Sequence, residues 1–262
     1  MSQLVIRRLD LPVDRLPRRG SGFRIAHLSD LHLRRWGRSE QQLQEALKQL
    51  ACDTLLITGD FGHDPEAYER TGELIRRLLA PLSVPLGIYG VLGNHDSPRL
   101  AEQDLPLTVL RDELRLIHVG PFEYYLGGIE QNAEARATVG GLGALPDDAP
   151  LVLMAHYPST VFELPSGRGA IMLSGHTHGG QIRLPGLGCL WANDPRLPRS
   201  MARGLHLTRG NWLHVSAGTG TSGPIPTRVL CPPEITVLRL RCAERVAISP
   251  ESRSAELAEA AA

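Results

Sequence analysis

Apolar runs alternate with amphipathic stretches through the first half of the chain. The apolar runs predicted as strands are residues 23–28, 54–58 and 84–92. Amphipathic stretches that open with capping signals are predicted as helices over residues 40–51, 64–80 and 97–112. Ser39 with Gln42 has capping-box spacing, which predicts the start of the first helix there. Strand-helix-strand units of this length favour right-handed crossovers and a parallel sheet.

The second half of the chain contains more strands and fewer helices. Its predicted strands are residues 114–119, 124–129, 151–155, 170–173, 212–216 and 234–240. Short helices are predicted near 133–145 and 159–164, and residues 184–211 form a Gly- and Pro-rich stretch expected to be a long loop. So many strands with so few helices predict an α/β fold in which a second sheet packs on the first, with helices outside.

No internal repeat and no linker divides the chain. We therefore expect one domain over residues 1–249, with its core at 23–240, and a frayed Ala- and Glu-rich tail over 250–262. Lys plus Arg equals Asp plus Glu at 28 each, so the composition gives no sign of a nucleic-acid partner. Four cysteines without C-x-x-C spacing favour a reducing compartment, and no apolar leader precedes the domain, so a cytoplasmic protein is expected.

Polar residues follow five of the predicted strands at the point where each strand ends. They are Asp30 and His32 in S-D-L-H, Asp60 in T-G-D, Asn94 in G-N-H-D, His156, and His176 and His178 in G-H-T-H. Ligands of open α/β sheets bind at the carboxyl ends of the strands, so these side chains are expected at one edge. The sequence therefore predicts that they converge.

The mixture of side chains indicates metal chemistry. Imidazole nitrogen, carboxylate oxygen and one amide oxygen together suit Mn, Fe, Zn or Ni better than Ca or Mg. Each motif alone has an ordinary explanation, because Gly-Asp is a common turn pair and a lone histidine at a strand end usually finds a hydrogen bond. Five such motifs together would bury many ionisable groups at high cost without a cation.

In this order the motifs resemble the calcineurin-like metallophosphoesterase superfamily, whose pattern is D-x-H, G-D, G-N-H-[DE], H and G-H-x-H. Further segments, among them G-H-T-H-G-G-Q-I and S-A-G-T-G-T-S-G, are similar to the bacterial branch of YaeI-like and YkuE-like phosphodiesterases. The resemblance covers roughly residues 23–240. It implies a four-layer α-β-β-α sandwich of two mixed sheets with flanking helices.

The resemblance also implies a set of roles for these residues. Asp30, His32, Asp60 and His178 would hold one divalent metal, and Asp60, Asn94, His156 and His176 a second. Asp60 would bridge the two ions, of which Mn is favoured, and a hydroxide shared by them would attack phosphorus in line. His95 would assist the leaving group, with Asp96 orienting its ring.

The substrate is less closely defined by the sequence. Arg228, in the Gly-rich segment after residue 216, is predicted to bind substrate phosphate, although pairing with a surface carboxylate explains it equally well. Between Met1 and Arg38 nine Arg stand against three Asp. Together with apolar residues such as Trp36, Leu187 and Trp191, this basic start raises the possibility of peripheral contact with an anionic membrane on the cytoplasmic side.

Three functions are consistent with the sequence. The favoured one is a metal-dependent phosphodiesterase acting on a small-molecule or lipid-linked phosphoester. The second is a UDP-diacylglucosamine pyrophosphatase of lipid A synthesis, although the most familiar form of that enzyme has Arg where this chain has His95. The third is a scaffold that keeps the fold without catalysis, which usually lacks one or more of the ligands present here. The oligomeric state is left open.

Overall fold

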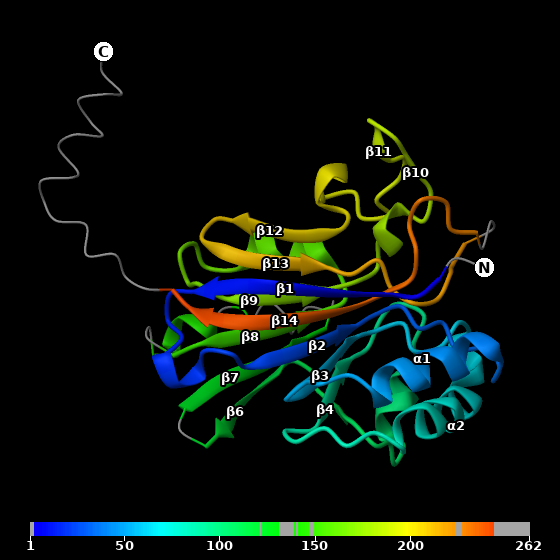
Figure 1. Ribbon diagram of the computed structural model, residues 1–262, viewed down its shortest axis with the longest axis horizontal. Coiled ribbons are helices and arrows are strands. Elements are labelled where there is room, and N and C mark those ends of the chain that lie inside the picture. Colours follow the sequence, from blue (N-terminus) through cyan, green and yellow to red (C-terminus); the bar gives the residue numbers. More distant parts are fainter. Residues whose placement is uncertain are drawn as a thin grey trace, which may run out of the picture.

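Two six-stranded mixed sheets lie face to face in the computed structural model (Figure 1). The structure describes residues 3–120, 122–130, 139, 141–146, 149–223 and 227–243. The first sheet has the order β1 (Val5–Val13), β14 (Glu234–Cys242), β2 (Arg24–Leu28), β3 (Thr54–Thr58), β4 (Ile88–Val91) and β5 (Thr108–Val109). The second has the order β12 (Gly204–Thr208), β13 (Asn211–Val215), β9 (Ile171–Ser174), β8 (Leu151–Ala155), β7 (Phe122–Ile129) and β6 (Glu113–Val119).

The directions of the strands explain where their ends gather. Strands β2 to β5 are parallel, as are β7, β8, β9 and β13, while β14 runs antiparallel to β2 and parallel to β1. The edge pairs β6–β7 and β12–β13 are antiparallel hairpins. Both sheets are thus mixed, which confirms the predicted α/β sandwich.

Successive side chains of β3 point alternately into two hydrophobic cores. Leu56 packs between the sheets, whereas Leu55 and Ile57 face the helices on the outer side. This is the two-residue period of a strand that is buried on both faces. The core between the sheets also holds Met154 and Leu173 of the second sheet.

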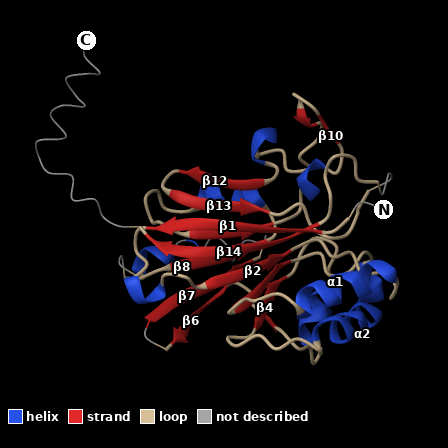
Figure 2. Cartoon of the chain, in the orientation of Figure 1, coloured by secondary structure: helices blue, strands red, loops and turns tan. Residues whose placement is uncertain are grey.

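Two α-helices cover the outer face of the first sheet (Figure 2). Helix α1 (Arg38–Lys48) buries Leu43 and Leu47, and helix α2 (Tyr68–Leu79) buries a longer apolar stripe that includes Leu78. Both stripes have the spacing of a helix with one buried face. Asp64, at the predicted start of this helix, caps the short 3-10 turn ahead of α2, where its side chain accepts a hydrogen bond from the Glu66 amide.

The outer face of the second sheet has a thinner cover in the described part of the chain. Short 3-10 helices, η4 (Leu142–Ala144) and η5 (Pro158–Glu163), pack Leu142 and Val161 against β8, β9 and β13. The helix predicted near 133–145 lies largely outside the described residues, as does the tail at 250–262. The short helix predicted near 159–164 is the 3-10 helix η5, which ends at Glu163.

Several predicted elements are wrong. Residues 97–112 contain only a 3-10 helix, η3 (Pro98–Glu102), followed by β5. The capping box predicted for Ser39 and Gln42 is wrong, because α1 begins two residues before the predicted start and its N-cap is Gly37, whose amide donates to the Glu40 side chain. Strand β1 was not predicted. The stretch 184–211 is not a plain loop, since it includes the small hairpin β10 (Arg183–Leu184) and β11 (Gly188–Cys189), the 3-10 helix η7 (Arg199–Met201) and β12.

Candidate metal centre

The ends of five strands bring the predicted ligands to one place. Asp30, Asp60 and Asn94 follow β2, β3 and β4 of the first sheet, and His156 and His176 follow β8 and β9 of the second. Backbone hydrogen bonds connect the strand exits, the loops that directly follow these strands: the Asp30 amide donates to the Gly59 carbonyl at 3.0 Å.

Among the described helices, none is long and apolar enough to cross a membrane.

Four of the ligand candidates form the first group. Each of Asp30, His32, Asp60 and His178 offers one ligand atom, and these atoms all lie within 4.8 Å of one another. The Nε2 atoms of His32 and His178 are 3.1 Å apart, and the His32 Nε2 atom is 3.4 Å from Asp60 Oδ2. All four residues are buried. Together these atoms outline a space for one cation.

A second group adjoins the first through Asp60. The Nε2 atom of His156 lies 3.1 Å from Asn94 Oδ1, 3.2 Å from His176 Nδ1 and 3.5 Å from Asp60 Oδ2. The same carboxylate oxygen therefore faces both groups. The structure brings together all seven residues that the sequence singled out as ligands.

Backbone carbonyls orient the rings of His156 and His176. His156 Nδ1 lies 2.7 Å from the Thr58 carbonyl, and His176 Nε2 lies 2.9 Å from the Asn193 carbonyl. A carbonyl accepts only, so these nitrogens carry the hydrogen, and the lone pairs of the opposite nitrogens point into the centre. This is how metal-binding histidines are usually oriented.

Backbone strain concentrates at the same residues. Five of the seven ligand candidates have positive φ: Asp30 (50°), His32 (45°), Asp60 (54°), His176 (67°) and His178 (52°). Left-handed backbone is unfavourable for residues other than glycine, and clusters of such residues mark functional sites. The packing of the strand exits holds these side chains toward one another at that cost.

Glycines allow the exits to approach closely. Gly59 has φ of 87°, and a Cβ atom there would lie 2.6 Å from the Gly93 amide nitrogen and 2.8 Å from His156 Nδ1. A Cβ atom on Gly93 would collide with the Asp60 carboxylate. Both positions therefore require glycine if Asp60 is to reach the centre.

Burial keeps three of the imidazoles neutral. It lowers the pKa of His32 to about 3 and that of His176 to about 4, and it lowers the pKa of His178 well below its ordinary value. Neutral imidazole is the form that binds metals. These side chains are therefore ready to act as ligands at neutral pH.

Burial and neighbouring charges shift the pKa values of Asp30, Asp60 and His156. Burial raises the pKa of Asp30 to about 7. Burial works against ionisation of Asp60 as well, but the neighbouring His156 holds the pKa of Asp60 well below its usual range. Burial opposes a charge on His156, yet Asp60 raises the pKa of His156 to about 9. Asp60 thus favours a positive charge at this point, which a cation between Asp60 and His156 would supply while leaving the His156 Nε2 lone pair to bind it.

The residues fit divalent metals on their chemistry. Two neutral imidazoles whose Nε2 lone pairs meet at 3.1 Å repel each other unless a proton or a cation lies between them. Buried Asp30 ionises readily only beside a positive charge. Nitrogen and carboxylate ligands of this kind suit first-row transition metals.

His95 lies beside the first group. Its Nδ1 atom is 3.1 Å from the His63 carbonyl, which leaves Nε2 free to hold a proton, and its amide donates to Asp60 Oδ1 at 2.9 Å. The rings of His63 and His95 stack with centroids 5.6 Å apart. Sequence reasoning did not assign His63 to the site, and its only signal was its position three residues after Asp60.

Asp96 contacts the backbone and not the ring of His95. Its Oδ1 accepts from the Gly62 amide at 3.0 Å and its Oδ2 from the Gly93 amide at 2.9 Å. The expected Asp96–His95 contact is thus replaced by the His63 carbonyl. Asp96 instead links the exits of β3 and β4. Burial raises its pKa to about 6.

Arg228 lies close to the centre but is engaged with the backbone. Its guanidinium donates to the carbonyls of Ala217, Gly220 and Cys231. Each of its three nitrogens donates to one of these carbonyls. Its role in binding substrate phosphate stays a prediction.

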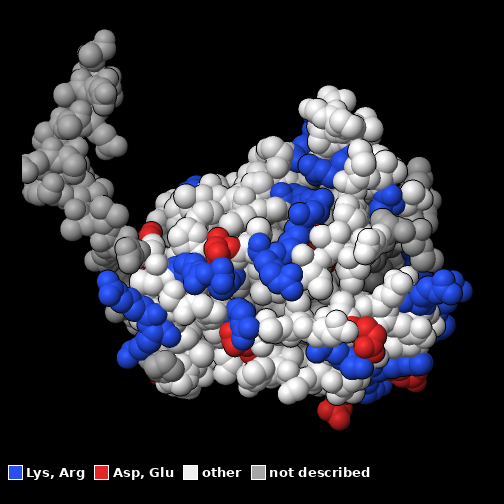
Figure 3. Space-filling view, in the orientation of Figure 1, with Lys and Arg blue, Asp and Glu red and all other residues white. Residues whose placement is uncertain are grey.

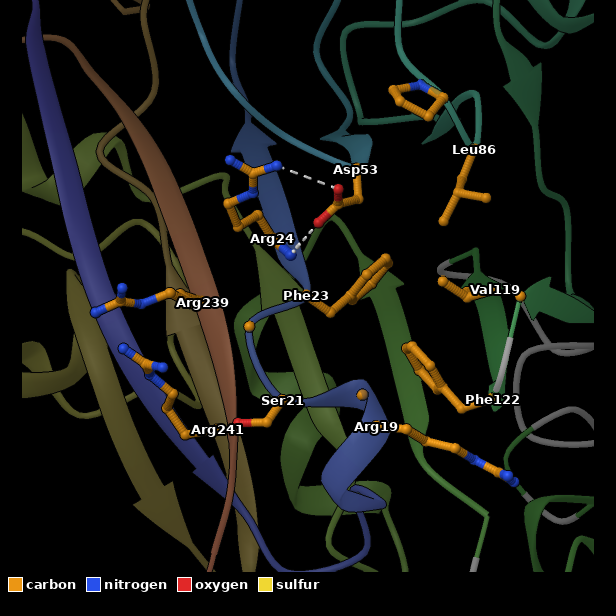
Figure 4. Close-up of a pocket in the computed structure, with 14 residues that line it drawn as sticks. Arg19, Ser21, Phe23, Arg24, Asp53, Leu86, Val119, Phe122, Arg239 and Arg241 are labelled. Atoms are coloured by element: carbon orange, nitrogen blue, oxygen red, sulfur yellow. Dashed lines mark hydrogen bonds and ion pairs between the residues drawn. The ribbon is translucent and has the colours of Figure 1, made fainter.

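Two cavities lie at opposite ends of the strands. One of about 210 Å³ adjoins the second group and is lined by residues that include Asn94, His156 and Tyr157. A larger one of about 560 Å³ lies where β2 begins, beside Phe23, Arg24 and residues preceding β3 (Figure 4). None of the seven ligand candidates lines the larger cavity, whereas Asn94 and His156 line the smaller one.

The chain is similar in sequence to known phosphoesterases. The family model described as calcineurin-like phosphoesterase matches residues 23–180. The uncharacterized metallophosphoesterases YkoQ and YkuE of Bacillus subtilis are each 28% identical to this chain, with 85% of this chain and 85% of YkoQ covered, and 86% of this chain and 82% of YkuE. The UDP-2,3-diacylglucosamine pyrophosphatase LpxG of Chlamydia muridarum is 26% identical, with 86% of each chain covered. The chain belongs to the calcineurin-like phosphoesterase family.

Proposed function

We propose that this protein is a phosphodiesterase that uses two divalent cations. The observation that supports this most directly is the position of Asp60 Oδ2, 3.4 Å from His32 Nε2 and 3.5 Å from His156 Nε2. One carboxylate oxygen shared by two groups of ligands is what a two-metal centre requires. Membership of the family implies phosphoester hydrolysis in general, and the diester preference is our proposal.

The seven ligand candidates divide between two cations. Asp30, His32 and His178 would hold the first with Asp60, whereas Asn94, His156 and His176 would hold the second with Asp60. When bound, such cations lower the pKa of water and neutralise charge on phosphoryl oxygens. Manganese is our first choice among Mn, Fe, Zn and Ni.

His95 is proposed to assist the leaving group. Because Nδ1 donates to the His63 carbonyl, Nε2 is the nitrogen that would hold a proton toward the departing oxygen. Asp60 fixes the backbone at the same residue, since its Oδ1 accepts from the His95 amide. Asp96 contributes by holding the amides of Gly62 and Gly93, which positions both flanking loops.

Hydrolysis of bis(p-nitrophenyl) phosphate with added manganese tests this function. We expect turnover by the natural sequence, a loss of about 100- to 10,000-fold in His95→Ala, and no turnover in Asp60→Ala. His118→Ala is a matched control, because His118 is an exposed histidine on β6 that pairs with Glu123. Full metal occupancy without turnover of mono-, di- or pyrophosphate substrates would identify a scaffold instead.

A pyrophosphatase acting on a nucleotide-linked lipid is the second candidate. The similarity to LpxG, named as a UDP-2,3-diacylglucosamine pyrophosphatase, favours it. Adding a nucleotide-linked lipid to the substrate panel separates the two: a much higher kcat/KM for this lipid than for the simple diester would make the protein a lipid pyrophosphatase.

We propose a cytoplasmic location with peripheral contact to an anionic membrane, and no nucleic-acid partner. The cysteines Cys52, Cys189, Cys231 and Cys242 are unpaired, which suits a reducing compartment. Equal numbers of acidic and basic residues supply no general attraction to nucleic acid.

A further inference from the structure

Exposed apolar side chains gather at one projection of the molecule. Eight large hydrophobic residues are exposed among the described residues, and six of them lie on the β10–β11 hairpin, directly after it, or on the segment paired with it. We call these six the apolar tip: Leu184, Leu187, Leu190, Trp191, Val229 and Leu230. Leu187 and Trp191 are 73% and 74% exposed. Figure 1 shows the hairpin standing clear of both sheets.

The apolar tip is held in place by the rest of the fold. The Arg183 amide donates to the Val229 carbonyl at 3.0 Å, and the Val229 amide donates to the Gln181 carbonyl at 2.9 Å. Below the tip, Cys189 is buried with Ala192 and Ala202. The exposure of Leu187 and Trp191 therefore belongs to an ordered hairpin.

The hairpin is continuous with the metal centre. Gly179 and Gly180 follow the ligand candidate His178 and lead directly into β10. After β11, the Asn193 carbonyl lies 2.9 Å from His176 Nε2. Both ends of the hairpin are therefore connected to residues of the metal centre.

Positive charge lies beside the tip. Arg183 is part of β10, and the carbonyl of exposed Arg199 accepts a hydrogen bond from Cys189 of β11. Arg196 and Arg203 instead pair with Glu163 and Glu234, and Arg228 donates to backbone carbonyls. In Figure 3 the projecting surface is uncharged, and Lys and Arg side chains lie below it. Leucine and tryptophan tips flanked by basic side chains are typical of surfaces that enter the interface of an anionic bilayer.

We propose that the apolar tip docks this protein on a lipid bilayer that carries anionic headgroups. A protein partner is less favoured, since stable protein interfaces use about 20–30 residues from each side and the tip has six. A bilayer needs only a few inserted apolar side chains and nearby basic charge. This deepens the proposed function, because it would bring lipid-linked phosphoesters to the metal centre.

Sedimentation of the full chain with vesicles tests the inference. We expect binding to phosphatidylcholine vesicles that contain phosphatidylglycerol, weaker binding to pure phosphatidylcholine, and a loss of about tenfold or more in Leu187→Ser/Trp191→Ser. Leu116→Ser/Leu207→Ser is the matched control, because both leucines are exposed on edge strands away from the hairpin. The control should bind as the natural sequence does.

A second measurement follows insertion directly. Trp36→Phe/Trp212→Phe leaves Trp191 as the single tryptophan, and its fluorescence should shift to shorter wavelength on phosphatidylglycerol-containing vesicles. Absence of both binding and shift would overturn the inference, as would equal losses in the test and control variants. A dimer that dissociates in Leu187→Ser/Trp191→Ser would make a second copy the occupant instead.

Hydrolysis of soluble bis(p-nitrophenyl) phosphate separates this inference from the proposed function. We expect Leu187→Ser/Trp191→Ser to retain it, since neither side chain is a ligand candidate. Hydrolysis without vesicle binding would contradict only the docking surface. Vesicle binding without hydrolysis would contradict only the phosphodiesterase.

Discussion

At the scale of single residues, the centre depends on backbone conformations that its sequence does not favour. Five of the seven ligand candidates are non-glycine residues with positive φ. Each such residue costs about 1–3 kcal/mol, which the packing of the strand exits must offset. The ligand identities could be predicted from the order of the motifs, but this strain could not, because it arises only when the exits of two sheets meet.

Gly93→Ala tests the close packing of two strand exits. The added Cβ would collide with the Asp60 carboxylate, so we expect loss of bound metal and at least a tenfold fall in phosphodiesterase activity. Gly141→Ala is the control, because a Cβ there meets no described atom within 4 Å. Normal metal content in Gly93→Ala, measured by elemental analysis, would show that Asp60 does not need this space.

A buried pair of histidines between the sheets should make stability depend on pH. His27 Nδ1 lies 2.8 Å from His214 Nδ1, and His27 Nε2 lies 2.9 Å from the Thr58 hydroxyl. The sequence carries no signal for this pairing, since the two residues are 187 positions apart. Burial lowers the pKa of His214 to about 4 and that of His27 well below its ordinary value.

The lowered pKa values of His27 and His214 should make the folded state less stable at acid pH. Unfolding lets both imidazoles take up protons below about pH 6.5, while the folded chain resists protonation. The free energy of unfolding should therefore fall as the pH drops from 6.5 toward 4, by about 1.4 kcal/mol per pH unit for each group. Urea unfolding with chelator present should show a shallower pH dependence in His27→Leu/His214→Leu. An unchanged slope would contradict this account.

At the scale of elements, the predicted strands were found where an apolar run is buried on both faces. The apolar runs at 54–58 and 151–155 are strands because both of their faces are covered. Strand β1 was missed because Arg7, Arg8 and Pro12 interrupt its apolar residues, yet an edge strand tolerates proline and exposed charge. Residues 97–112 do not continue as a helix, because Leu105 and Leu107 instead pack into the core beneath α1 and α2.

Helix α2 is expected to contribute stability through its buried stripe. Leu78 is fully buried against the first sheet, so Leu78→Ala should lower the free energy of unfolding by about 2–5 kcal/mol. Arg70→Ala changes an exposed position of the same helix and should have an effect below about 0.5 kcal/mol. Similar thermal midpoints for the two variants would show that this packing is not needed.

At the scale of the whole molecule, the centre joins the two sheets. Asp30, Asp60 and Asn94 come from the first sheet, and His156, His176 and His178 follow strands of the second. The sequence predicted this meeting because ligands at the ends of parallel strands gather at one edge. It singled out Leu187 and Trp191 for membrane contact, but it could not group them with the other four residues of the apolar tip, because exposure depends on what the folded chain leaves uncovered.

Removal of metal should therefore loosen the contact between the sheets. Metal at about 100 times its Kd stabilises the folded state by about 2.7 kcal/mol, so chelation should lower the thermal midpoint by about 5–10 °C. Manganese should restore it. Asp60→Ala should respond to neither treatment, and a natural chain that is equally insensitive would show that cations do not hold the sheets together.

The most direct test of the central claim is anomalous diffraction from crystals grown with manganese. We predict two peaks about 3.5–4 Å apart, both beside Asp60, one among Asp30, His32 and His178 and the other among Asn94, His156 and His176. Peaks away from Asp60, or a single ion with only one of these groups around it, would contradict the two-cation centre.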